Sequence, residues 1–394
     1  MTLGQTTSSL QTRDLTTGDL DAAFDVRSRS FGPLNPSMRD WWNTVQQESI
    51  DENRAIGVFD GQRLLAHAKV RSYQQFWGGR SMPMGGVAGV VVAPEARGRG
   101  VGSRLMAAIA GRSRELGDLV SALYPATIPM YRALGWEVVG AQHRISMPAE
   151  ALRKLVSKDV VLRRATGSDV EAFCQSLFDR YVAHRASGPK LLSIAEAKEQ
   201  LTDDSMMSYL TEGGSVVYEW HEGDLVVSYM LADTPEIARA LWSMVGSGSS
   251  IAKKVVAYVA PDDPIHLLLP EEVAHESHLT RWMLRVMDAP KAVAARGFPP
   301  ALTGSVMILL EDPLFPDNTG SWRLEVSGGT GELVPIEATS SGLCLGPNGF
   351  AALYAGTPTH VLRTAGLASA GEPAQDQMLD AVFAGRPAYL LEYF

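Results

Sequence analysis

The stretch Val90-Val-Val-Ala-Pro-Glu-Ala-Arg-Gly-Arg-Gly-Val-Gly-Ser103 decides the fold of this chain. An apolar strand runs into a loop with three glycines, and from Val101 onward Leu105, Met106 and Ile109 recur at helical spacing. Glycine allows positive φ angles and a close approach of the backbone to a ligand. The first N–H groups of a helix lack intrahelical partners and carry the positive end of its dipole. The stretch therefore predicts a site for a pyrophosphate.

The spacing of this loop excludes two familiar phosphate-binding motifs. No Gly-Lys-Ser/Thr follows, as in a P-loop, and the dinucleotide pattern G-x-G-x-x-G is absent. The order Arg97-x-x-Gly100-x-Gly102 after a strand resembles the acetyl-CoA loop of the GCN5-related N-acetyltransferases, whose pattern is Q/R-x-x-G-x-G/A. Residues 363–368 also match the pattern, but no long amphipathic helix follows them. The alternative interpretation of residues 90–103 is an ordinary strand-to-helix turn.

This resemblance implies acetyl-CoA as the co-substrate and a set of cofactor-binding residues. They are Val90, Val91, Val92, Arg97, Gly98, Arg99, Gly100, Val101, Gly102, Ser103, Ala126 and Thr127. Of these, Val90 and Val92 would present backbone groups to the pantetheine and to the thioester oxygen. Ala126 and Thr127 match the family by position rather than by chemistry.

The bulk properties are those of an ordinary globular protein. The chain has 394 residues, 45% of them hydrophobic and 20% charged, with a net charge of −9. This length predicts two or three domains, and the acidic balance disfavours nucleic acid and suits a cationic substrate. The two cysteines, Cys174 and Cys344, indicate neither a metal site nor a disulfide framework. We see no signal peptide and no membrane-length apolar run, and so expect a cytoplasmic protein that contacts no membrane.

An internal repeat predicts a duplicated domain. The motif R-x-x-T-x-x-D-[LV]-[DE]-A occurs at residues 13–22 and again at residues 163–172. Each threonine has an acid three residues on, close to a capping box, ahead of an apolar-periodic helix. A hairpin pattern at residues 55–70 has a similar counterpart at residues 215–231. Chance similarity between two capped helices is the alternative explanation.

The second copy lacks the cofactor loop. Between residues 151 and 290 no arginine is followed by x-x-G-x-G/A, and the strand ending at Ala232 continues into Asp233-Thr-Pro-Glu before a helix at 237–245. An acid in that loop would repel a phosphate. We infer that the second copy is structural, or forms part of a pocket wall.

The last third of the chain has a different pattern of expected strands and helices. It contains expected strands at 302–310, 320–326, 336–339 and 342–345, helices at 347–354 and 376–383, and a strand-like apolar end at 387–394. Termini are usually frayed and polar, so an end with one charged side chain in eight residues is expected to be docked.

This organisation is similar to that of the Eis (enhanced intracellular survival) family of N-acetyltransferases. The fold class it implies is mixed α+β: two tandem acetyltransferase-like domains, the second degenerate, followed by a domain similar to sterol carrier protein. We place these domains at residues 1–147, 148–290 and 291–394. The resemblance also implies a homo-oligomer, a hexamer.

Two groups are the candidate acid and base for amine acetylation. Pro129 suits the first turn of a short helix and Gly135 its C-terminal end, and the family resemblance places the general acid in this segment at Tyr131. Tyr124 is the competing phenol, but it belongs to the preceding strand at 118–124. The same resemblance makes the main-chain carboxylate of Phe394 the general base. The alternatives are a packing tyrosine and a tail that only packs.

The acceptor pocket is the part least determined by the sequence. Candidate acids are Asp25, Asp40 and Glu392, although strand alternation turns Glu392 away from the side of residue 393. Candidate aromatics are Phe24, Phe31, Trp41, Trp42, Tyr73, Phe76 and Trp77, with residues 31–42 expected as a loop. For each of them packing is the alternative role.

These residues predict an acetyltransferase for a small cationic amine such as an aminoglycoside or a polyamine. Two alternatives remain. One keeps the enzyme and changes the acceptor to protein lysines or a small amine metabolite. The other is a non-enzymatic carrier of lipid built on the third domain.

Overall fold

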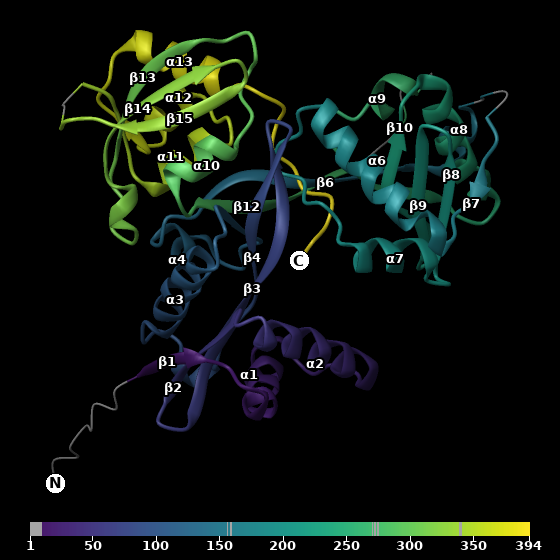
Figure 1. Ribbon diagram of the computed structural model, residues 1–394. Helices are drawn as coiled ribbons and strands as arrows, with labels where there is room; N and C mark the ends of the chain where they lie inside the picture. The colour runs from purple at the N-terminus through teal and green to yellow at the C-terminus, as the bar shows by residue number, and fades with distance from the viewer. Residues whose placement is uncertain are drawn as a thin grey trace.

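The chain forms two β-sheets and three units in the computed structural model shown in Figure 1. The structure describes residues 10–394 apart from 156, 158, 159, 270, 272, 274, 275, 339 and 340. One sheet has 12 strands and runs through the first two units, and the other has five strands and belongs to the third.

The first unit extends from β1 to β6. Its elements are β1 (Gln11–Asp14), α1 (Leu20–Phe31), α2 (Pro36–Asp51), β2 (Ala55–Asp60), β3 (Arg63–Trp77), β4 (Arg80–Val92), α3 (Val101–Glu115), β5 (Val120–Leu123), α4 (Ile128–Arg132) and β6 (Glu137–Pro148). Helix α3 packs against β2, β3 and β4, so the helix that follows the glycine-rich loop covers the sheet.

The second unit repeats this order of elements. It comprises α5 (Ala149–Arg153), β7 (Arg163–Arg164), α6 (Val170–Ala183), α7 (Ile194–Thr202), β8 (Met206–Thr211), β9 (Gly214–His221), β10 (Asp224–Ala232), α8 (Pro235–Gly246), β11 (Lys254–Val259), α9 (Ile265–Leu268) and β12 (Glu276–Val286).

The third unit is a five-stranded sheet packed against helices. It comprises α10 (Ala289–Ala295), β13 (Gly304–Leu310), β14 (Gly320–Ser327), β15 (Thr330–Pro335), β16 (Leu343–Leu345), α11 (Pro347–Tyr354), α12 (Thr359–Thr364), β17 (Ala368–Ser369) and α13 (Pro373–Phe383). This unit is anchored on the long sheet, because Tyr354 packs 5.2 Å from the ring of Trp77 and buried Arg285 of β12 pairs with Asp312 at 2.7 Å.

The first two units exchange strands in the middle of the long sheet. The strand order is β1-β2-β3-β4-β5-β12-β6-β11-β10-β9-β8-β7. Strand β12, late in the chain, lies between β5 and β6, while β6 pairs with β11 of the second unit. Each unit thus completes the sheet of the other, and the two halves are held together by continuous backbone hydrogen bonds.

The structure confirms the repeated capping motif. Thr16 with Asp19 and Thr166 with Asp169 both form a capping box. Both aspartates also pair with the arginine that opens the motif, with oxygen to nitrogen distances of 2.8 Å and 2.6 Å. The two copies therefore begin with the same set of side-chain interactions.

The predicted equivalence of the two hairpins is wrong by one strand. The symmetric sheet order matches β2 and β3 with β8 and β9, whereas the hairpin pattern at 215–231 corresponds to β9 and β10. Both hairpins of the second unit turn at a glycine with positive φ, Gly213 and Gly223, so the pattern did not distinguish them.

Several local predictions need correction. Residues 31–42 are not a loop, because α2 begins at Pro36 after the N-cap Asn35, whose side chain accepts from Met38 N. This is a regular helix start with proline in the first turn. Residues 336–338 form no strand, Thr339 lies outside the described residues, and the strand there is β15. The C-terminal end is extended but makes a single bridge, between Tyr389 and Ala141.

Candidate active site

The centre of the first unit is a pair of parallel strands that part. Strands β4 and β5 are paired only from Met84 to Gly86, opposite Val120 to Ala122. On its other side β4 carries a bulge, because its register with β3 shifts between Ala88 and Val91, where Gly89 has a φ of +61°. A bulge re-aims the backbone and leaves a residue outside the ladder. The predicted residues Val90 and Val92 therefore lie on the stretch of β4 that extends beyond its pairing with β5.

The glycine-rich loop follows directly and leads into α3. Gly98 and Gly100 both have a φ of +73°, a conformation that favours glycine, and Gly100 is the N-cap of α3. No described side chain caps this helix, and its first turn carries no acid. The N–H groups at the start of α3 are thus free to hold an anion. Residues 97–100 are exposed, so a large ligand can reach them.

Two contacts hold the loop against the end of β4. The Ser30 hydroxyl donates to the carbonyl oxygen of Val92 at 3.2 Å, and Arg97 Nε donates to the same oxygen at 3.4 Å. Gly102 has a packing reason as well, because a Cβ there would lie 3.0 Å from the sulfur of Met130 in α4. The loop therefore sits between α1 and α4.

Tyr131 lies in α4, on the other side of the opening. Pro129 falls in the first turn of this helix, Thr127 is its N-cap, and Gly135 has a φ of +92° just after it, as predicted. The tyrosine is 4% exposed. Burial, with a smaller contribution from the Tyr393 phenol, raises the pKa of Tyr131 to about 12. The phenol therefore keeps its proton at neutral pH. Ala126 and Thr127 are exposed beside it.

The last residue of the chain docks next to the paired part of β4 and β5. The ring of Phe394 lies 5.2 Å from Tyr73 and 5.6 Å from Tyr124. A Cβ on Gly86 would come within 3.0 Å of the Phe394 ring, so glycine makes room for it. Tyr393 stacks on Tyr124 at 4.3 Å. The C-terminal residues thus reach the same region as Tyr131.

Tyr124, the competing phenol, is engaged in this contact. It stands just past the end of β5, and its hydroxyl donates to the carbonyl oxygen of Glu392 at 2.9 Å. Burial raises the pKa of Tyr124 above its usual range. Its position holds the C-terminal segment.

The three candidate acids lie in different surroundings. Asp25 pairs with Arg29 at 2.8 Å on the outside of α1, and Asp40 is exposed on α2. Glu392 points into the second unit, where Tyr229 of β10 donates to its Oε1 at 2.5 Å. Glu392 and Tyr393 contact different groups, although residues 391–394 form no strand. Burial raises the pKa of the Glu392 carboxyl.

Most of the candidate aromatics are packing residues. Phe76 and Trp77 are fully buried in the core, and Phe24 and Trp42 pack on each other at 5.4 Å. Tyr73 is the member of the set that contacts Phe394. It also lines a pocket of about 280 Å³ together with Arg71 and Glu196.

The sequence did not point to Tyr229. It is a buried tyrosine of a strand with ordinary alternation, in the copy that lacks the cofactor loop. A contact over 163 residues carries no local signal.

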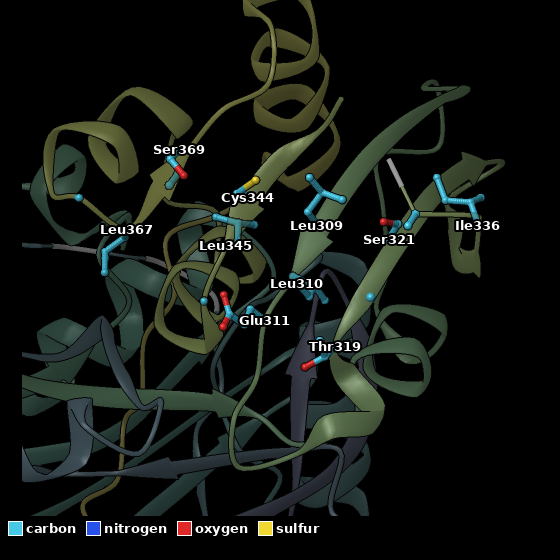
Figure 2. Close-up of a pocket in the computed structure, with 15 residues that line it drawn as sticks. Leu309, Leu310, Glu311, Thr319, Ser321, Ile336, Cys344, Leu345, Leu367 and Ser369 are labelled. Atoms are coloured by element: carbon cyan, nitrogen blue, oxygen red, sulfur yellow. The ribbon is translucent and has the colours of Figure 1, made fainter. Parts of the chain in front are cut away.

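One pocket belongs to the third unit (Figure 2). It measures about 760 Å³ and lies at the ends of β13, β14 and β16, with Leu309, Thr319, Ser321 and Cys344 among its walls. None of the described residues predicted to bind acetyl-CoA or to catalyse lines it. The other face of this sheet is packed against helices through residues such as Phe350 and Phe383.

An uncapped helix after a strand and a glycine-rich loop is the arrangement expected from the resemblance to the acetyl-CoA-dependent N-acetyltransferases. Family models agree: an acetyltransferase (GNAT) domain matches residues 11–139, a second acetyltransferase (GNAT) domain matches 184–286, and a sterol carrier protein domain matches 289–391.

Individual relatives match from two thirds to nearly all of the chain. It is 46% identical to a solved GCN5-related N-acetyltransferase from Kribbella flavida, with a TM-score of 0.96 and 98% of each chain covered. It is 27% identical to an uncharacterized N-acetyltransferase of Streptomyces avermitilis, covering 78% of this chain and 80% of the relative. It is 25% identical to the N-acetyltransferase Eis of Mycobacterium tuberculosis, covering 66% of this chain and 67% of that protein. The chain belongs to the GCN5-related N-acetyltransferases and is similar to the Eis N-acetyltransferases among them.

This membership makes the chain an N-acetyltransferase and implies acetyl-CoA as its co-substrate. The mixed α+β fold with two acetyltransferase domains and a sterol carrier domain is as predicted. The domain boundaries at 147 and 290 stay predictions. Among the described residues, no group of three or more metal-binding side chains converges and no helix is long and apolar enough to span a membrane.

Proposed function

We propose that this enzyme acetylates primary amines of a small cationic acceptor, such as an aminoglycoside or a polyamine, at one or more positions. The observation that carries the proposal is the docking of the C-terminal residue beside the opening between β4 and β5, with its ring against Tyr73 and Tyr124. A chain end held there can present its carboxylate to an amine that approaches the thioester.

The cofactor would lie along the bulged part of β4 and the start of α3. Its pyrophosphate would accept hydrogen bonds from the N–H groups of residues 98–103, and its pantetheine would run along Val90 to Val92, with Ala126 and Thr127 on the far side. Arg97 and Arg99 add positive charge beside the exposed loop. The supporting geometry is the uncapped helix and the free edge of β4.

The transfer itself needs three proton movements. The terminal carboxylate of Phe394 accepts a proton from the acceptor ammonium, and the freed amine nitrogen attacks the thioester carbon. The C–N bond forms, the C–S bond breaks, and Tyr131 gives its proton to the departing thiolate. The second proton of the attacking nitrogen then leaves to restore the Tyr131 phenol, which gives the neutral amide. A pKa of about 12 supports this role, because Tyr131 is protonated when the thiolate appears.

The acceptor class is supported by the overall charge of the chain. The chain carries a net charge of −9, which suits an amine-rich cation. The pocket of about 280 Å³ beside Tyr73 has mixed charge, because both Arg71 and Glu196 line it and Glu196 pairs with Lys190 at 3.0 Å. A hexameric assembly remains a prediction from the family resemblance, and sedimentation of the purified protein tests it.

Extending the chain tests the base. Two glycines added after Phe394 move the carboxylate by up to about 7 Å. We expect kcat to fall at least 100-fold, while the Kd for acetyl-CoA, measured by calorimetry, stays within twofold. The same two glycines at the N-terminus are the control. An extended chain with full kcat would show that the carboxylate is not the base.

A panel of acceptors tests the substrate class. Thiol release is measured with aminoglycosides, linear polyamines and a lysine peptide at equal amine concentration. We expect kcat/KM to be highest for the polycationic small molecules. A preference for the lysine peptide would replace this acceptor class with protein lysines.

A further inference from the structure

The C-terminal segment crosses the second unit before it reaches the first. In Figure 1 it runs as a yellow trace from the third unit to the middle of the molecule. Arg386 binds Asp262 with Nε 2.6 Å from Oδ2 at the start of this path. Three hydrogen bonds then fix the main chain of the segment. Tyr389 N donates to Ser187 O at 3.1 Å and Leu390 N to Ala141 O at 3.4 Å, and the side-chain Nε2 of Gln142 donates to Leu391 O at 2.7 Å.

The segment lies where the second unit has its own strand opening. Strands β10 and β11 are parallel partners from Leu225 to Val227, and then part as β4 and β5 do. The pocket beyond this point measures about 130 Å³, and Arg386, Tyr389 and Leu391 form part of its wall. The opening that takes the cofactor in the first unit is therefore bordered in the second by the chain's own C-terminal segment.

Glu392 ties this segment to both units at once. Its buried carboxylate accepts from the Tyr229 hydroxyl of β10, and its carbonyl oxygen accepts from the Tyr124 hydroxyl at the end of β5. Only Tyr393 separates it from Phe394. Fixing Glu392 by its side chain and its main chain leaves few free torsions before the terminal carboxylate.

We propose that Tyr229 and Glu392 form a positioning pair, through which the cofactor-free second unit holds the terminal carboxylate of the chain in place for the first. This rests on the proposed role of the Phe394 carboxylate as the general base. A misplacement of a catalytic group by about 1 Å can lower a rate on the order of 100-fold. The pair acts on geometry, so it affects the chemical step and not the binding of acetyl-CoA.

Charged and titratable groups surround the pair on several elements. Lys190 and Glu196 pair with each other at 3.0 Å beside Tyr73, and Tyr181 packs from α6. The hydroxyls of Tyr73 and Tyr181 and Glu392 Oε2 are buried with no hydrogen-bond partner among the described residues. Loss of the Tyr229 hydroxyl would leave the Glu392 carboxylate without its described hydrogen-bond partner. The last residues would then be held by the Tyr124 contact and by the hydrogen bonds to residues 389–391.

The test is Tyr229→Phe in the full-length enzyme, which keeps the ring and removes the hydroxyl. We expect kcat to fall 10-fold or more, with the acetyl-CoA Kd within twofold of the parent. Tyr218→Phe is the matched control in the neighbouring strand, since its hydroxyl faces the sulfur of Met244 at 3.8 Å and not the segment. It should leave kcat within twofold.

Variants of Glu392 separate positioning from general destabilisation. Glu392→Gln retains an acceptor for Tyr229 and should keep at least fivefold more kcat than Glu392→Ala. Equal losses in these two variants, or equal losses in Tyr229→Phe and Tyr218→Phe, would overturn the positioning role.

The extended chain distinguishes this proposal from the one on which it rests. If the two added glycines abolish turnover while Tyr229→Phe keeps kcat within twofold, the base assignment stands and the positioning pair is wrong. If the extended chain retains full kcat, the base assignment is wrong and the positioning pair falls with it.

Discussion

The two acetyltransferase domains of this chain differ at the N-terminus of the corresponding helix, α3 in the first domain and α8 in the second. In the first, α3 starts at Gly100 with no capping side chain among the described residues and no acid in its first turn. In the second, α8 starts at Thr234, whose hydroxyl accepts from Ile237 N at 3.3 Å, and Glu236 lies in the first turn. The Thr234 side chain satisfies one of the free N–H groups, and the Glu236 carboxylate neutralises the positive end of the helix dipole. An anion site is thus removed by two side chains while the fold remains.

The openings beside the parallel strand pairs, β4 and β5 in the first domain and β10 and β11 in the second, also differ. The opening in the first domain is flanked by an exposed loop, whereas the C-terminal segment borders the one in the second. The parallel strand pair of the second domain is therefore bordered by a peptide segment, where that of the first is proposed to take the cofactor. If the first domain carries out the acetyl transfer and the second positions the C-terminal segment, matched substitutions in the two domains should differ in their effects.

The largest effect is expected at the short helices after β5 and β11. Two residues past a proline stand buried Tyr131 in the first domain and exposed His266 in the second. General acid catalysis contributes about 10²- to 10⁴-fold. Tyr131→Phe should lower kcat by about 100-fold or more, with KM for acetyl-CoA little changed, in a steady-state thiol-release assay.

His266→Ala is the matched variant in the second domain and should leave kcat within twofold. A comparable loss in both variants would mean that the second domain takes part in the chemistry, and that the division between the domains is wrong.

Acid should weaken the first domain and not the hold on the C-terminal segment. His67 Nε2 lies 3.0 Å from the carbonyl oxygen of Ala23, and burial lowers the pKa of His67 from 6.5 to about 4. Below pH 6.5 His67 binds a proton in the unfolded chain but stays neutral in the folded protein until about pH 4. Stability should fall by about 2 kcal/mol between pH 7 and pH 5, and by about 3 kcal/mol in total near pH 4.

Acid has the opposite effect on stability through Glu392. Burial raises the pKa of its carboxyl, so the folded state takes up the proton first and acid favours the docked segment. Urea unfolding at pH 7 and pH 5 measures the net slope, and His67→Gln, which does not titrate, should flatten it. An unchanged slope in His67→Gln would show that His67 is not its source.

The cofactor loop and the fold class were predictable because their signals are local. Alternating glycines after a strand and before a helix fix the loop within 14 residues, and the capping boxes repeat with their pairing arginine. The strand exchange was not predictable. Strands β6 and β12 pair across 130 residues or more, and neither carries a sequence pattern that indicates its neighbour in the sheet.

The acceptor side was less predictable for the same reason. Tyr73, Tyr124, Glu196 and Tyr229 come from two domains and meet around the last three residues, so their roles depend on tertiary contacts. Residues 31–42 show a different failure. Their prolines suggested a loop, although Asn35 followed by Pro36 is a regular helix start.

A smaller effect is expected from strain in the loop. Gly100 has a φ of +73° with no described atom within 4 Å of an added Cβ, so a substitution there is strained by its backbone alone. A left-handed conformation costs a residue with a Cβ about 1 to 2 kcal/mol. Gly100→Val should weaken acetyl-CoA binding about 5- to 30-fold, as the loop relaxes away from the geometry that faces the phosphates.

Gly223→Val is the matched variant, with a φ of +88° and equally open surroundings in a hairpin of the second domain. It should lower stability and leave the acetyl-CoA Kd unchanged. A loss of affinity in both would mean that strain anywhere in the long sheet reaches the cofactor site, and that the two domains are not separate in function.

The smallest effect concerns the cap that closes the second site. Thr234→Ala should cost about 1 kcal/mol of stability in urea unfolding, the usual contribution of an N-cap. Calorimetry with the parent enzyme should give one acetyl-CoA per chain, and Thr234→Ala should not raise this number, because Glu236 still opposes the dipole and the C-terminal segment still borders the opening. A second acetyl-CoA bound by the Thr234→Ala, Glu236→Gln double variant would show that the cap and the acid alone keep the cofactor out. Binding of one equivalent even then would assign the exclusion to the segment and to the missing glycines.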